Sequence, residues 1–190
     1  MFKTSLSDIA SIQTGLFAKP TSEGEVVYLQ AKHFDENRVI KQLLQPEIKA
    51  DYVTEKHLLR QGDILFAAKG TNNFAALFEN KNKPAVASTT FFVIRLQEKF
   101  QKKILPEFLV WLINHPISQK FLKGNAIGTS MVSISKVVLG ELKISIPPVK
   151  TQKAILQIAN LYKEEKKIKQ QIDKLQEQQI QQQIINSINL

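Results

Sequence analysis

The chain has 190 residues, of which 43% are hydrophobic, so it can bury the core of one domain and still extend beyond it. It contains no cysteine, which excludes disulfide bonds and thiolate metal sites. No apolar run reaches ~18 residues, and residues 1–5 lack the features of a signal peptide. We therefore expect a cytoplasmic protein without a membrane segment.

The net charge of +9 indicates which partners to expect. Residues 151–190 hold six lysines and four acidic residues, which leaves a net charge of +7 for residues 1–150. A basic globular domain favours a polyanionic partner, and nucleic acid is the common one. The alternative is an ordinary lysine-rich protein, and charge alone does not separate the two.

The first half of the chain predicts short strands separated by turns. Residues 9–12 predict a short amphipathic turn that Gly15 closes. Residues 25–30, 39–44 and 64–68 predict strands, while 46–52 predicts a loop. Gly62 and Asp63 predict a turn in which the carboxylate caps backbone amides. Residues 69–73 then form a polar loop with one glycine.

The second half mixes helices and strands. Residues 75–78 and 89–96 predict two strands, and 106–115 predicts a helix that Pro116 ends. Residues 118–122 predict a short helix, 133–139 a helix or turn, and 141–146 the last strand. Because strands and helices alternate without a repeat, we predict an α+β domain with a mixed sheet over residues 1–148.

A long helix is predicted for residues 149–190. Pro147 and Pro148 end the preceding strand, Thr151 is the predicted N-cap, and no glycine or proline follows. At ~1.5 Å per residue, a helix from Thr151 to near Asn189 would span roughly 57 Å. Its ten glutamines are interpreted as a solvated face.

One apolar stripe on this helix predicts a coiled coil. Its residues recur at alternating spacings of three and four, with Glu165 at the skipped position, and they then slip to a spacing of four. Because such a stripe must be buried and the chain offers no other long helix, we infer pairing with a partner chain or another copy. The predicted dimerisation residues are Ile158, Leu161, Ile168, Ile172, Leu175, Ile180, Ile184 and Ile188, with Ala154 also on the stripe.

The sequence predicts no catalytic residue, metal site or cofactor. His33, His57 and His115 lack metal-ligand spacing, and neither a glycine-rich phosphate loop nor a nucleophile elbow is present. Glu47 and Lys49 form half of a nuclease motif, for which Asp35 is the nearest second acid. Such short matches arise by chance, and the predicted loop would hold a metal poorly. An amino-methyltransferase needs an Asn or Asp before prolines such as Pro147 and Pro148 and an aromatic residue after them to bind a flipped base. Ile146 and Val149 stand at these positions.

The order of several weak motifs resembles the specificity subunit of type I restriction–modification systems. The resemblance covers almost the whole chain. It begins at residues 6–15, continues through residues 59–66 with Lys69-Gly70, and includes residues 92–95. It is strongest at residues 128–130, followed by 142–148, Gln152 and the long helix.

The resemblance implies a non-catalytic subunit whose target recognition domain reads half of a bipartite site in double-stranded DNA. The helix is expected to pack antiparallel on a second such helix, to set the distance between two recognition domains, and to dock the methyltransferase and restriction subunits. Full-length members carry two recognition domains and two helical regions, whereas this chain has one of each. We therefore expect a dimer, either with itself on a palindromic interrupted target or with another half-specificity subunit. A truncated, inactive gene is the further alternative.

Candidate DNA contacts follow from residue type. Lysines are expected to contact phosphates, and amides and hydroxyls in loops are expected to contact base edges. The phosphate candidates are Lys32, Lys69, Lys81, Lys83, Lys120 and Lys123. The base-edge candidates are Thr71, Asn72, Asn73, Asn125, Thr129 and Ser130. The aromatic residues Phe74, Phe78, Phe91, Phe92 and Trp111 are interpreted as core rather than as stacking platforms.

Two other functions compete with DNA recognition. One is a coiled-coil assembly or adaptor protein whose basic charge is incidental, which predicts partner binding without DNA preference. The other is a metal-dependent nuclease that uses Asp35, Glu47 and Lys49, which predicts magnesium-dependent cutting. The family resemblance favours the DNA-recognition subunit over both.

Overall fold

The computed structural model describes residues 2–40, 44–70, 72–79, 84–128 and 133–188. They form two compact units, Met1–Gln152 and Lys153–Leu190. The first unit combines short helices with sheets that hold both parallel and antiparallel pairs, and the second consists of one long helix. The predicted α+β class with a mixed sheet and a long C-terminal helix is therefore confirmed.

Within the described residues, three sheets organise the first unit. One pairs β1 (Phe2–Ser5) with β9 (Lys143–Ile146), and Phe2 lies opposite Ile146. The second is antiparallel, in the order β2 (Ala10–Thr14), β8 (Phe91–Leu96), β5 (Ile64–Ala67) and β6 (Ala75–Leu77). The third has the order β4 (Pro46–Ile48), β3 (Val26–Leu29) and β7 (Ala85–Ala87), and its β3–β7 pair is parallel.

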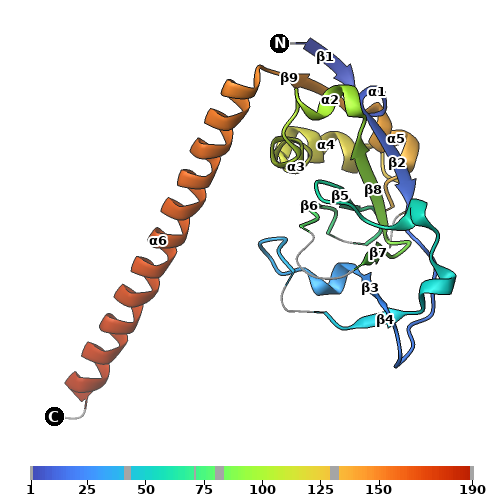
Figure 1. Ribbon diagram of the computed structural model, residues 1–190. Coiled ribbons are helices and arrows are strands. Elements are labelled where there is room, and N and C mark those ends of the chain that lie inside the picture. Colours follow the sequence, from blue (N-terminus) through green and yellow to red (C-terminus); the bar gives the residue numbers. More distant parts are fainter. Residues whose placement is uncertain (1, 41–43, 71, 80–83, 129–132, 189–190) are drawn as a thin grey trace. The chain divides into compact units, whose positions relative to one another are not determined.

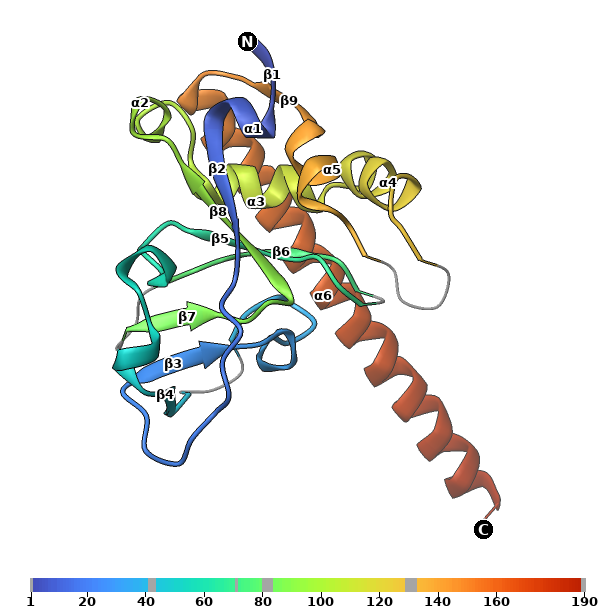
Figure 2. The ribbon, with the colours of Figure 1, turned by 90° about the vertical axis from the view of Figure 1, so that its right-hand side faces the viewer.

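The helices of this unit are short. They are α1 (Leu6–Ile9), α2 (Glu98–Gln101), α3 (Pro106–Asn114), α4 (Pro116–Gly124) and α5 (Lys136–Glu141), with 3-10 turns η1 (Ala31–His33), η2 (Ala50–Tyr52) and η3 (Glu55–His57). Helices α2 to α5 gather at the end of the unit that holds β1 and β9, and the sheet of β4, β3 and β7 lies at the other end (Figures 1 and 2). The four-stranded sheet lies between these two ends.

The four-stranded sheet separates two hydrophobic cores. In β5, Ile64 and Phe66 pack into one core, whereas Leu65 and Ala67 pack into the other. All four side chains are fully buried, and burial of each large apolar side chain stabilises the fold by about 1.5–3 kcal/mol. A strand buried on both faces has a continuous apolar sequence, which explains why residues 64–68 show no alternation.

Most of the predicted elements are confirmed. The strands predicted at 25–30, 64–68, 75–78, 89–96 and 141–146 are β3, β5, β6, β8 and β9, and the helices predicted at 106–115 and 118–122 are α3 and α4. Pro116 ends α3 as predicted, but it also begins α4, because its fixed φ suits a first helical position. The helix or turn predicted at 133–139 is α5, which begins at Lys136.

Other predictions were wrong. The loop predicted at 46–52 contains strand β4 and turn η2, and residues 9–12 continue from α1 into strand β2. Strands β1 and β7 were not predicted. Thr151 is not an N-cap, because α6 (Val149–Ile188) begins two residues earlier. The strand predicted at 39–44 lies partly outside the described residues, and its Ile40 forms an isolated bridge with Phe34.

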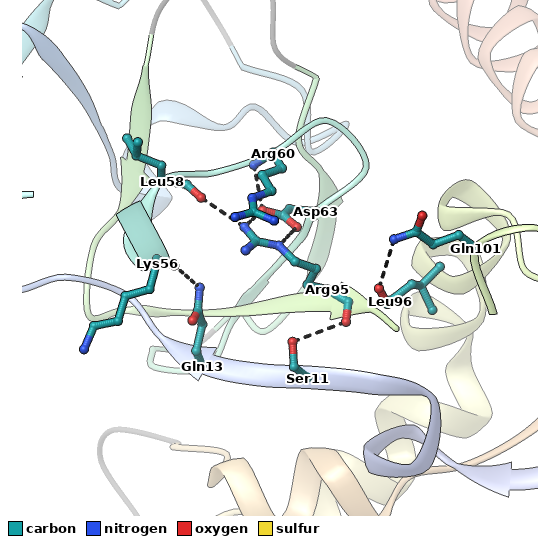
Figure 3. A network of polar contacts seen from close by, with 9 residues as sticks. All are labelled: Ser11, Gln13, Lys56, Leu58, Arg60, Asp63, Arg95, Leu96 and Gln101. Carbon is teal, nitrogen blue, oxygen red and sulfur yellow. Dashed lines mark hydrogen bonds and ion pairs between the residues drawn. The ribbon is translucent and has the colours of Figure 1, made fainter. Parts of the chain in front are cut away.

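The predicted turn at Gly62 and Asp63 is confirmed and has a further role. Gly62 has a φ of 87°, and the Asp63 carboxylate accepts a hydrogen bond from Arg60 N–H at 2.8 Å. The same buried carboxylate binds Arg95 through its Nε at 2.7 Å and its Nη2 at 2.6 Å, and Nη2 also donates to Leu58 O at 2.9 Å (Figure 3). These hydrogen bonds raise the pKa of Arg95 and join the turn to β8.

Candidate nucleic-acid interface and pairing helix

The first turn of α6 is held to the globular unit by one glutamine. Gln152 is fully buried, and it is the only buried residue of α6. Its Oε1 accepts a hydrogen bond from Leu105 N–H at 2.9 Å. Its Nε2 donates to Lys103 O and to Pro147 O, both at 2.8 Å. The side chain therefore joins the helix start to the α2–α3 connection and to the end of β9.

The role of Gln152 was missed in the sequence analysis. A local signal was present, because Gln152 lies three and four residues before Ile155 and Leu156, so it shares a helix face with apolar side chains. A polar residue at such a position is either solvated or fully hydrogen-bonded. Two of the three backbone groups that bind it, at Lys103 and Leu105, lie more than forty residues away in sequence, so the sequence does not show which case holds.

The apolar stripe of α6 is exposed. Ile172 is 47% and Leu161 is 70% exposed, and the other predicted dimerisation residues lie in the same open range or above it. These side chains are Ile158, Leu161, Ile168, Ile172, Leu175, Ile180, Ile184 and Ile188. An uninterrupted helix with such a stripe gains stability when a second helix covers it.

Glu165, the polar residue between the apolar residues Leu161 and Ile168 of the stripe, forms an ion pair within its own helix. Glu165 accepts a hydrogen bond from Lys169 Nζ at 2.7 Å, one helical turn further along. This contact raises the pKa of Lys169. Both side chains are exposed, so the pair contributes little to stability by itself. It does place the carboxylate of Glu165 beside a cation rather than beside bare apolar surface.

Two of the predicted DNA-contact segments lie side by side. Lys69 forms an isolated antiparallel bridge with Ser133, and Ile127 forms another with the same residue. Ile134 N–H also donates to Ala68 O at 2.9 Å. The segment that follows β5 is therefore held against Ser133 and Ile134, and Ser133 in turn pairs with Ile127. The side chains of Lys69 and Asn72 on this loop are exposed.

Helix α4, which precedes Ile127 in the chain, carries further predicted contacts. Lys120 and Lys123 are exposed, while Ser118 and Leu122 face the interior. Asn125 follows the helix and is exposed, and its Nδ2 donates to Phe121 O at 2.9 Å.

The remaining predicted phosphate contact among the described residues, Lys32, lies on turn η1, next to the loop that carries Asn72. Lys32 is exposed on η1, and Phe34 directly after η1 packs against Phe74 at 5.7 Å and Phe91 at 5.6 Å between ring centroids. Phe74 follows the polar loop that carries Asn72, so the aromatic cluster fixes η1 beside that loop. The interpretation of Phe74, Phe78 and Phe91 as core residues is confirmed by their packing in the core that holds Leu65 and Ala67, and Phe92 packs against the core that holds Ile64 and Phe66.

One predicted base contact is buried, and three predicted base contacts and two predicted phosphate contacts lie outside the described residues. Asn73 is buried, its Nδ2 donates to Ala67 O at 3.1 Å, and its Oδ1 has no hydrogen-bond partner among the described residues. Sequence alone does not distinguish an inward from an outward amide in a polar loop. The candidates Thr71, Lys81, Lys83, Thr129 and Ser130 lie outside the described residues.

The described residues give no support to metal chemistry. Glu47 lies in strand β4 rather than in the predicted loop, and Asp35 accepts a hydrogen bond from Val39 N–H at 2.8 Å in a turn. Among the described residues, no three His, Cys, Asp or Glu side chains are grouped so that they could hold a metal ion. In the same part of the chain, no helix is long and apolar enough to cross a membrane.

Solved structures share this fold. A structure reported for the assembly and conformational transition of the type I R-M system matches with a TM-score of 0.66 and 19% identity, over 89% of this chain and 44% of that one. The HsdS subunit from Thermoanaerobacter tengcongensis matches at 0.61 and 20%, over 88% and 43%. The type I S subunit from M. genitalium matches at 0.57 and 17%, over 86% and 39%.

The chain therefore spans less than half the length of each of these three proteins. No curated protein sequence matches it. A family model described as "Type I restriction modification DNA specificity domain" matches residues 3–188, which is nearly the whole chain. The resemblance stated from the sequence is confirmed, and the chain belongs to the family of type I restriction modification DNA specificity domains.

Proposed function

We propose that this chain is a DNA-recognition component of a type I restriction–modification system and acts as a specificity half-subunit without catalytic activity of its own. One observation carries the proposal beyond family membership. A basic globular unit is followed by a single helix of 40 residues whose apolar stripe is exposed. The basic unit suits a polyanion, and the helix suits a second helix of the same kind.

The proposed DNA-binding surface combines the loop after β5, helix α4 and turn η1. Lys32, Lys69, Lys120 and Lys123 are proposed to contact phosphates, and Asn72 and Asn125 are proposed to contact base edges. The contacts that join the loop after β5 to Ser133, Ser133 to Ile127 beyond α4, and η1 to the same loop support the assignment. Thr71, Lys81, Lys83, Thr129 and Ser130 remain proposed contacts from the sequence, and Asn73 is replaced in that role by its neighbours.

The helix is proposed to pair antiparallel with the same helix of a second copy. Two identical recognition units related by a two-fold axis would read the same half-site in opposite orientations, which gives a palindromic interrupted target. The pairing helix would set the spacing between the half-sites. Pairing with another half-specificity subunit would instead give two different half-sites.

The methyltransferase and restriction subunits are the proposed enzymatic partners. In this proposal the specificity half-subunit recognises the DNA sequence, and the partner subunits carry the catalytic activities. The solved structure with the highest TM-score of the three comes from work on the assembly of a type I R-M system, which supports looking for such partners.

The test selects DNA sites from a random duplex library, with the purified chain alone and together with a methyltransferase subunit. The expected result is a bipartite site whose affinity falls steeply with salt, because lysine–phosphate contacts release counterions. The double variant Ile168→Lys with Ile172→Lys is expected to lose the bipartite site while circular dichroism shows a folded globular unit. Binding to partner proteins with no DNA selection would refute the proposal and favour the adaptor function.

A further inference from the structure

The apolar stripe of α6 changes face near its C-terminal end. Ile158, Leu161, Ile168, Ile172 and Leu175 occupy the a and d positions of successive heptads, with Glu165 at an a position between them. The next seam positions hold Gln179, Gln182 and Asn186. At ~100° per residue, Ile180, Ile184 and Ile188 lie on a face about 140° away from the first one. Only the first face forms a continuous heptad seam.

Glu165 discriminates between parallel and antiparallel pairing of two copies. In a parallel pair in register, each a residue faces the same residue of the second copy, so two Glu165 carboxylates would meet in the seam. An antiparallel pair opposes a and d positions instead, and Glu165 then faces an apolar residue. A parallel pair would also bring Glu164 near the second copy's Lys169. That exposed ion pair is weak, and Lys169 is already bound to Glu165.

The apolar residues select one antiparallel register. When Ile158 faces Leu175 of the second copy, Leu161 faces Ile172 and Glu165 faces Ile168, so four of the five large side chains meet another one. A shift of one heptad in one direction sets Leu161 against Glu165 and Leu175 against Thr151. A shift in the other direction sets Leu161 against Gln179 and Ile158 against Gln182.

The charges beside the seam select the same register independently. In antiparallel pairs the flanking e residues face e residues and the flanking g residues face g residues. In the register above, Glu164 faces Gln171 and Tyr162 faces Lys169, so no like charges meet. One heptad shift brings Glu164 against Glu164, and the other brings Lys169 against Lys169. Either shift therefore adds repulsion to the loss of apolar contacts.

We infer that α6 pairs with α6 of a second copy in a single antiparallel register, in which Ile158 packs on Leu175 and Leu161 on Ile172, and that Glu165 enforces this orientation. The inference rests on the proposed pairing of two copies and specifies it. The two helices overlap over most of their length. Ile180, Ile184 and Ile188, which the sequence analysis placed in the dimerisation stripe, lie outside this seam.

Cysteine cross-linking of the full chain tests the register against a clean background, because the protein has no native cysteine. The double variant Ile158→Cys with Leu175→Cys is expected to form a covalent dimer under mild oxidation or with a short bismaleimide. Ile158→Cys alone is the matched control and is expected to stay uncross-linked, since a parallel pair would join these two cysteines. The pairs Ile158→Cys with Ile168→Cys, and Ile168→Cys with Ile172→Cys, report the two shifted registers.

The outcomes separate the register from the pairing itself. Cross-linking of the single variant or of a shifted pair, in a protein that light scattering shows to be dimeric, overturns the register and leaves the proposed dimer intact. A wild-type mass near 21.6 kDa rather than twice that value overturns both. In the cysteine background, Ile184→Lys is expected to retain the cross-link, whereas Ile172→Lys is expected to abolish it.

Discussion

Replacement of Gln152 by methionine tests whether one buried side chain holds the start of α6 to the globular unit. Methionine has a similar length and helix propensity, so the substitution removes polar contacts with little change in packing volume. Three hydrogen bonds of 2.8–2.9 Å are lost, each to a backbone group of the globular unit. At about 1 kcal/mol net per hydrogen bond, the free energy of unfolding should fall by about 3 kcal/mol.

The assay is urea unfolding followed by fluorescence of Trp111, the single tryptophan. It lies in α3, which begins one residue after Leu105, a hydrogen-bond partner of Gln152. With a slope of about 2 kcal/mol per molar urea, a loss of about 3 kcal/mol lowers the midpoint by roughly 1.5 M. The melting temperature of a unit of this size should fall by about 6–12 °C.

Gln157→Met is the matched control for Gln152→Met. Gln157 is exposed on the same helix, so the identical substitution should change the free energy of unfolding by less than about 0.5 kcal/mol. Equal, small effects of the two variants would refute the reasoning, because they would show that the three hydrogen bonds add nothing beyond those that the unfolded chain makes with water.

Three further predictions test separate parts of the argument. Asp63→Asn leaves Arg95 without its carboxylate partner and should cost about 2–4 kcal/mol by urea unfolding, less than for a fully buried pair because the Arg95 side chain is 22% exposed. Lys120→Glu should weaken DNA binding at all sequences and lower the salt slope by about 1, while Lys56→Glu, on turn η3 and outside the predicted contacts, should change neither. Insertion of seven residues after Lys153, between the globular unit and the seam that runs from Ile158 to Leu175, should change the spacer of the selected DNA site and leave each half-site sequence unchanged.

The elements that were predicted correctly are those whose signal is local. Helix α6 has no glycine or proline after its first turn, and its heptads repeat over more than twenty residues. Strand β5 is a short apolar run between turn residues, and Gly62 with Asp63 marks the turn before it. In each case the physical cause lies within a few residues of the element, so one sequence suffices.

The elements that were missed depend on distant partners. Strand β4 contains Pro46 and Glu47, which read as a loop, but Pro46 is the first residue of an edge strand, where a missing N–H is tolerated. Strand β1 forms because Phe2 pairs with Ile146, which comes near the end of the unit's sequence. The inward orientation of Asn73 depends on its hydrogen bond to the Ala67 carbonyl, and it could not be predicted from the sequence either. Site residues on loops are therefore the least predictable part of the molecule.

Glu165→Leu provides a final prediction that separates stability from specificity in the pairing helix. Leucine in place of the carboxylate completes the apolar seam and should stabilise the dimer, by up to about 1.5–3 kcal/mol for each buried side chain. A polar residue at one a position, however, specifies orientation at a cost in stability, and this variant removes it. A parallel pair then no longer opposes two carboxylates, and it gains Glu164–Lys169 contacts. In the Glu165→Leu background, Ile158→Cys alone should therefore begin to cross-link, although the dimer is tighter by light scattering. A tighter dimer that still rejects this cross-link would show that features outside the seam, and not Glu165, set the orientation of the two copies.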